Sequence, residues 1–163
     1  MTKKCNFKYT GAMVLGMHDA LVEISGIIAG LTFAIASQRV IIMTGAIAAV
    51  AASLSMSAAN YMAQRADGNP NAAVCAAYTG MMYIATSMAL LAPFCVIRNR
   101  FWAVGVMCAV VVGVVLIFNW YIGKKNRRPW HRAFWQMLGV CLGVSGASFL
   151  IGQAAKYFLG VTI

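Results

Sequence analysis

Residues 101–122 read FWAVGVMCAVVVGVVLIFNWYI, with no charged side chain from end to end. A run of about 20 apolar residues is the length that an α-helix needs to cross about 30 Å of hydrocarbon. The run is too long for a strand of a membrane barrel, and it lacks the alternation of apolar and polar residues that barrel strands show. The segment therefore predicts a transmembrane helix.

Four further apolar segments flank this one, and each ends in a short polar stretch. They cover residues 11–36, 40–62, 72–97 and 133–158. Each is long enough to cross a bilayer as a helix, the form in which every backbone polar group is satisfied within the segment. The sequence thus predicts an all-α integral membrane protein, a single domain over residues 1–163 with five transmembrane helices.

The composition agrees with a chain whose main partner is the lipid bilayer. It is 62% hydrophobic and 10% charged, whereas soluble domains carry about 25% charged residues. The net charge of +10 comes from 13 basic residues, which gather at the ends of the apolar segments as topology signals and headgroup contacts do. We therefore predict no nucleic-acid partner. We find no phosphate loop, HExxH motif, nucleophile elbow or zinc-ligand cluster, so we predict neither an enzyme nor a permanently bound cofactor.

Lys and Arg are distributed unequally between the two sides of the predicted helices. One side collects nine: three in the N-terminal tail, one at Arg65 and five at residues 124–132. The other side collects four. Because cytoplasmic loops carry the excess of Lys and Arg, the N-terminus is predicted to be cytoplasmic and the C-terminus to lie outside. The short loops suit a multi-pass protein of a prokaryotic plasma (inner) membrane.

Two of the three acidic residues lie inside the first apolar segment. They are Asp19 and Glu23, whereas Asp67 belongs to a turn. A charged carboxylate at the bilayer centre costs roughly 2.5–3.5 kcal/mol on insertion scales, and such acids usually mark ion or proton pathways. The spacing of four residues places both on one helical face. The structural alternative is a protonated Glu23 that makes only an interhelical hydrogen bond.

The second apolar segment offers a face of complementary donors. Ser53, Met56, Ser57 and Asn60 recur there at helical spacing. A thioether, an amide oxygen and hydroxyls beside the two carboxylates would form a mixed oxygen and sulfur site, which suits Fe²⁺ or Mn²⁺ better than Ca²⁺. Alternatively, Met56 packs in the core and the small residues let helices approach closely.

These two segments resemble the vacuolar iron transporter family. The run Gly16-Met17-His18-Asp19-Ala20-Leu21-Val22-Glu23 is similar to the first-span motif of that family, and residues 51–61, AASLSMSAANY, are similar to its second-span motif. The resemblance maps the family's first-span aspartate onto Asp19 and its second-span methionine onto Met56. Five spans with a cytoplasmic N-terminus also match the family.

The resemblance implies a homodimer that exports Fe²⁺, and often Mn²⁺, from the cytosol in exchange for protons, along a pathway between the subunits. The sequence departs from the family in two places. Residues 64–70 stand where iron-storing members carry a carboxylate-rich helical domain, and the family's second-span glutamate falls near Ala48. Glu23 is the candidate for that missing carboxylate.

We therefore predict a dimeric exporter whose metal ligands are Asp19, Glu23, Met56 and Asn60. Fe²⁺ or Mn²⁺ is the transported substrate, and Asp19 and Glu23 are the two proton sites from which the metal displaces protons. One alternative is a small multidrug-type antiporter of protons and lipophilic cations, which calls for an aromatic-lined cavity around Glu23. The other is a non-transporting membrane scaffold subunit, in which Asn and Gln can replace the acids.

Overall fold

The computed structural model describes residues 5–34, 37–126 and 130–159, and every regular element in these ranges is an α-helix. The helices are α1 (Cys5–Ala34), α2 (Gln38–Ala66), α3 (Ala72–Val96), α4 (Arg100–Asn126) and α5 (Trp130–Leu159). The prediction of an all-α chain is confirmed. The end of the first predicted segment (35–36) and parts of the basic stretches that set the predicted orientation (1–4 and 127–129) lie outside the described residues.

Four described helices are long and apolar enough to cross a membrane. These stretches are Tyr9–Phe33, Gln38–Ala66, Ala72–Val96 and Arg100–Trp120. In α5 the described apolar stretch, Phe134–Val144, is shorter than a span. The fifth span therefore stays a prediction.

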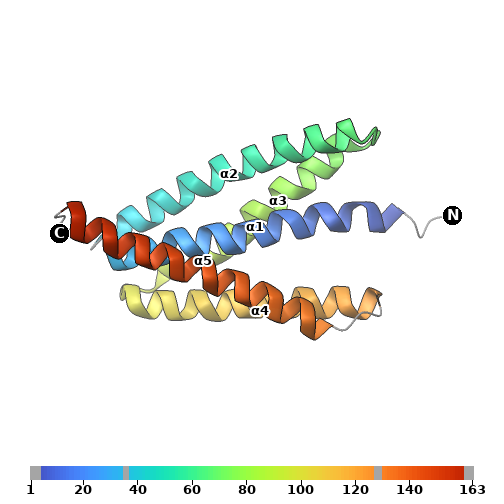
Figure 1. Ribbon diagram of the computed structural model, residues 1–163. Helices are drawn as coiled ribbons and strands as arrows, with labels where there is room; N and C mark the ends of the chain where they lie inside the picture. Colours follow the sequence, from blue (N-terminus) through green and yellow to red (C-terminus); the bar gives the residue numbers. More distant parts are fainter. Residues whose placement is uncertain (1–4, 35–36, 127–129, 160–163) are drawn as a thin grey trace.

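Helix α1 runs through the middle of the bundle and contacts each of the other four helices. It packs most extensively against α3 and α5, while α2 lies along α3 (Figure 1). Its buried face includes Met17, Leu21, Ile24 and Ile28, all at most 1% exposed. These residues recur every three or four positions, which gives a continuous apolar stripe on one side of the helix. The first turn of α1 and the last turn of α5 lie at opposite ends of the bundle (Figure 1).

A polar junction joins α1, α2 and α3. The Asn60 amide on α2 donates to the Thr79 hydroxyl on α3 at 2.6 Å. That hydroxyl in turn lies 3.1 Å from the carbonyl oxygen of Ala12 on α1. One turn after Ala12, a Cβ added at Gly16 would collide with the backbone carbonyl of Thr79. The glycine therefore lets α1 and α3 approach each other at the junction.

Serines line the contact between α2 and α3. Ser53 donates to the carbonyl oxygen of Gly80 at 3.1 Å, and Ser57 donates to the carbonyl oxygen of Ser53 at 2.8 Å. A Cβ at Gly80 would collide with the Ser57 hydroxyl. In the described part of the chain, every buried side-chain nitrogen and oxygen has a hydrogen-bond partner. Hydrocarbon offers no water to replace such partners, so this pairing is what a stable membrane bundle requires.

The other end of the α2–α3 pair is joined by Gln38, at the start of α2. Its amide donates to the carbonyl oxygens of Phe94 and Ile97, the latter at 2.7 Å. The last carbonyls of a helix have no partner within the helix. Gln38 therefore satisfies the end of α3 and fixes it to the start of its neighbour.

The outward faces of α2 and α4 carry large apolar side chains. On α2, Met43, Ile47, Leu54 and Met62 are each more than 60% exposed, and Ile117 on α4 is 70% exposed. Apolar surface of this extent on a soluble monomer would mark an interaction site. On a chain with spans of this length it is the surface that meets lipid or a neighbouring subunit.

Candidate functional site

The two carboxylates of α1 flank the centre of its apolar stretch. The stretch Tyr9–Phe33 is centred on residue 21, so Asp19 and Glu23 each lie two residues from the centre, about 3 Å along the helix axis. Both side chains are half-buried. A carboxylate at this depth needs a partner, a proton or a polar cavity, because bare hydrocarbon does not stabilise its charge.

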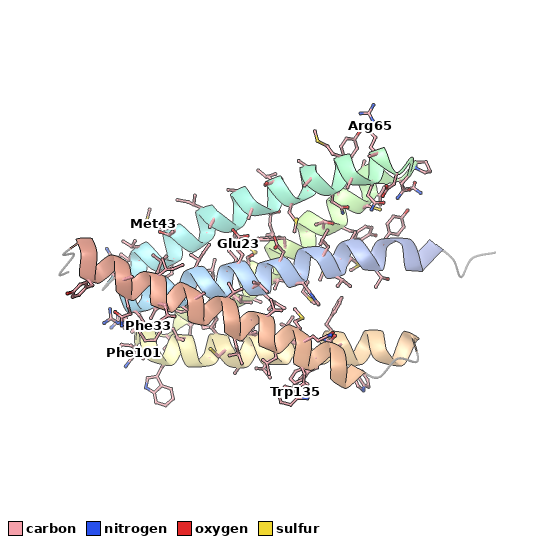
Figure 2. The ribbon with its side chains drawn as sticks, in the orientation of Figure 1. Glu23, Phe33, Met43, Arg65, Phe101 and Trp135 are labelled. Atoms are coloured by element: carbon pink, nitrogen blue, oxygen red, sulfur yellow. The ribbon has the colours of Figure 1, made fainter. Side chains whose placement is uncertain are left out.

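Glu23 has its partner on α3. The Tyr83 hydroxyl donates to Oε2 of Glu23 at 2.7 Å, and the Tyr83 side chain is fully buried. Figure 2 shows Glu23 partway along the bundle, between the end marked by Arg65 and the end where Phe33 and Phe101 meet. Because the tyrosine is the donor, this interhelical bond forms with a charged carboxylate as well as with a protonated one.

Asp19 lies on a cavity between α1 and α5. The cavity has a volume of about 510 Å³. Its wall on α1 is formed by Leu15, His18, Asp19 and Val22, which share one helical face. Its wall on α5 is formed by Gln136, Met137 and Val140. The two carboxylates therefore have different surroundings, although they are only one turn apart.

The segment with both carboxylates also carries a family signature. Residues 10–73 match the model of the VIT family, the family of vacuolar iron transporters. Through this segment the chain is similar to the VIT family. No curated protein sequence matches the chain at a significant level. The match covers about two fifths of the chain and holds Asp19, Glu23, Met56 and Asn60.

The match to the VIT family indicates the general role of the chain. The family consists of membrane transporters of metal ions, not of enzymes. Together with the four apolar helices, the match supports a multi-pass membrane protein with a role in metal-ion transport.

The structure places the other two predicted ligands on the side of α2 that meets its neighbours. Met56 is half-buried and packs against the core. Asn60 is buried, and its amide nitrogen donates to Thr79 and, at 3.4 Å, to the carbonyl oxygen of Cys75. The amide of Asn60 thus helps to hold α2 on α3. The assignment of Met56 and Asn60 as metal ligands stays a prediction.

Within the described residues, no three His, Cys, Asp or Glu side chains come together as a metal-binding group. A metal held at Asp19 or Glu23 must therefore draw further ligands from side chains of other types, from water or from a second subunit. Asn, Gln and Met side chains are among the protein donors of that kind near the two carboxylates or on the matched segment, together with the hydroxyl groups of Ser and Tyr.

Sequence reasoning missed Tyr83. The residue lies one position before the centre of α3, whereas tyrosines in membrane helices gather at the interfaces. A phenolic hydroxyl in mid-bilayer needs a hydrogen-bond partner, and Glu23 and Asp19 were the acids predicted at that depth. The position of Tyr83 in its segment was therefore the signal for a contact with a carboxylate.

Tyr83→Phe is expected to lower the stability of the protein by about 1 kcal/mol, the scale of interhelical hydrogen bonds in membrane proteins. The ring remains in the core, and only the donor to Glu23 is lost. Thermal unfolding in detergent measures the effect. Tyr61→Phe is the matched control, because Tyr61 lies on the exposed face of α2. Equal melting temperatures for Tyr83→Phe and the wild type would contradict the structural role of this bond.

Proposed function

We propose that the protein is a homodimeric, five-span exporter that moves Fe²⁺ and Mn²⁺ out of the cytosol in exchange for protons. One observation carries the proposal. Both carboxylates near the centre of the first span lie in the VIT-family segment and meet protein groups, Glu23 at Tyr83 and Asp19 at the α1–α5 cavity. Carboxylates that are kept at this depth and turned towards other helices are typical of ion and proton pathways.

The need for protons follows from the charge of the substrate. Moving a divalent cation outward against an inside-negative potential costs about 4.6 kcal/mol per 100 mV, twice the figure for one charge. Two protons that move inward cancel this charge. Asp19 and Glu23 are the proposed proton sites, and metal binding releases protons from them because a ligand must be deprotonated.

Met56 and Asn60 are proposed to complete the metal pathway with the two carboxylates. The support is chemical, since thioether sulfur and amide oxygen extend a carboxylate site towards borderline divalent metals. A second subunit is proposed to lie along the pathway, as the family resemblance implies. Because the carboxylate-rich domain of iron-storing members is absent between α2 and α3, which are joined by a short turn, metal is proposed to enter the pathway directly from the cytosol.

The proposed orientation has the N-terminus in the cytoplasm and the C-terminus outside, in a prokaryotic plasma membrane. The excess of Lys and Arg on one side supports the orientation. The opposite placement of the first turn of α1 and the last turn of α5 agrees with an odd number of spans. The short connections between helices support the location.

Glu23 meets one aromatic residue, Tyr83, through its hydroxyl. The cavity beside Asp19, one turn away, supports a metal over a lipophilic drug. A multidrug-type antiporter binds its cations against aromatic rings, but the described lining of this cavity holds no Phe, Tyr or Trp. Its polar groups are a carboxylate, an imidazole and an amide. Such groups suit a small ion that exchanges its water shell for protein ligands.

Transport by the purified protein in liposomes tests the proposal. We expect uptake of Fe²⁺ and Mn²⁺ that saturates with metal concentration, and no uptake of a lipophilic phosphonium cation. Protein-free vesicles provide the background rate. Uptake of the phosphonium cation without either metal would identify a drug-type antiporter. Transport of none of them would identify a scaffold subunit.

A further inference from the structure

We propose that His18, Asp19, Gln136 and Met137 form a metal-binding site for a borderline divalent cation in the cavity between α1 and α5. The site lies within one chain and shares only Asp19 with the ligand set proposed for transport. The proposal rests on the metal-transport function for the class of its ligand. The binding that it predicts is measured without transport.

The cavity brings together four kinds of donor atom. His18 and Asp19 are neighbours on α1 and line the same wall, while Gln136 and Met137 are neighbours on the facing wall of α5. They offer imidazole nitrogen, carboxylate oxygen, amide oxygen and thioether sulfur. Two adjacent residues from each of two packed helices can therefore approach one ion from opposite sides.

Burial separates the roles of these side chains. Met137 is buried, with 5% of its surface exposed, whereas His18 and Asp19 are half-buried and Gln136 is exposed. Met137 is thus the least accessible of the four residues and Gln136 the most accessible. Leu15, Val22 and Val140 supply the apolar part of the lining, which lowers the local polarity and strengthens the interaction of the carboxylate with a cation.

The size of the cavity suits an ion that still carries water. A water molecule takes about 30 Å³ of liquid volume, so six waters around a cation fill roughly 180 Å³. The cavity holds about 510 Å³. A hydrated divalent cation therefore fits before its waters are replaced by protein ligands, and water can complete the coordination at Asp19.

The donor set also determines the preferred metals. Nitrogen and thioether donors favour Fe²⁺, Co²⁺, Ni²⁺ and Zn²⁺ over Mn²⁺, in line with the general order of divalent affinities, while Mg²⁺ and Ca²⁺ prefer oxygen alone. His18 is thus expected to determine specificity. Without its imidazole, the remaining set is mostly oxygen and discriminates less against Mn²⁺.

Titration of the purified full-length protein with Co²⁺ in detergent tests the site, with visible absorption as the readout. We expect saturable binding of one Co²⁺ per chain in the wild type. His18→Asn should raise the Kd for Co²⁺ at least about tenfold, the scale of losses at metal sites. Gln136→Ala should also raise this Kd. The matched controls are His131→Asn and Gln153→Ala, which should bind like the wild type. Competition with Mn²⁺ should show a smaller preference for Co²⁺ in His18→Asn than in the wild type.

The Co²⁺ titration tests the metal site independently of the transport experiment in liposomes. Absence of saturable Co²⁺ binding to the wild type, or wild-type affinity in both His18→Asn and Gln136→Ala, would overturn the site even if the liposomes take up metal. Loss of affinity in both variants, with the two controls unchanged, would support the site even if the liposomes take up none. Because Gln136 is exposed and lies on a different helix from His18, its variant keeps the test valid if His18→Asn does not fold.

Discussion

Asp19→Asn is expected to reduce metal transport in liposomes at least about tenfold, the scale of losses when a metal site is disturbed. Asparagine keeps the size of the side chain but removes the negative charge on the α1–α5 cavity. The variant then lacks both the anion that attracts the cation and a group that exchanges a proton for it. The initial rate of Mn²⁺ uptake, normalised to the amount of folded protein, measures the loss.

Asp67→Asn is the matched control for this experiment. Asp67 is the exposed acid that follows α2, and it lies outside the membrane-spanning helices. Its replacement changes the net charge by the same amount and should leave the uptake rate unchanged. A wild-type rate in Asp19→Asn would remove Asp19 from the transport pathway. An equal loss in both variants would show that net charge, not the intramembrane carboxylate, controls the rate.

Gly16→Ala is expected to lower the stability of the protein strongly, because Gly16 lies against the backbone of α3. The new Cβ would overlap the backbone carbonyl of Thr79, which cannot rotate away as a side chain could. Helices α1 and α3 must then separate, and the Thr79 bond to Ala12 is lost with the contact. Overpacking of this kind costs about 1–3 kcal/mol, and more where the backbone itself must shift. Thermal unfolding in detergent measures the change.

Gly11→Ala separates this collision from the general effect of alanine on a helix. Gly11 lies on the same helix, and an added Cβ there has no neighbour within 4 Å. Alanine stabilises a helix interior by up to about 1 kcal/mol relative to glycine, so Gly11→Ala should melt at or above the wild-type temperature. If the two variants melted at the same temperature, the close approach at Gly16 would not be a determinant of the fold.

The helices were predictable because hydrocarbon imposes a length on every segment that crosses it. The apolar run at 101–122 lies within α4, and the run at 40–62 lies within α2. The helices continue beyond these runs, to Asn126 and Ala66. Hydropathy marks where the chain leaves hydrocarbon, but a helix can extend into the headgroup region, where water and long basic side chains satisfy its last turns.

The residues of the candidate site were only partly predictable. The residue type and the depth of Asp19 and Glu23 follow from the sequence alone, because both are set by where the two acids stand in the apolar segment. The partners depend on how the helices pack. Tyr83 and Gln136 come from α3 and α5, and only the central position of α1 brings them to its two acids.

The face of α2 illustrates the same limit. Its small and polar residues predicted either ligands for a metal or a close helix contact. Ser53 and Asn60 make hydrogen bonds to α3 in the structure. Hydroxyl and amide groups serve both purposes, and their spacing along a helix is the same in either case. Only their neighbours in space distinguish the two.

Proton movement during metal uptake tests metal–proton exchange most directly. Proteoliposomes are loaded with a pH-sensitive dye, and Mn²⁺ is added outside without an imposed pH gradient. Proton-coupled exchange predicts that the lumen becomes alkaline as Mn²⁺ enters, at a rate proportional to the uptake, and that both signals disappear in Asp19→Asn. Mn²⁺ uptake at a constant internal pH, with the membrane potential clamped, would contradict proton-coupled transport.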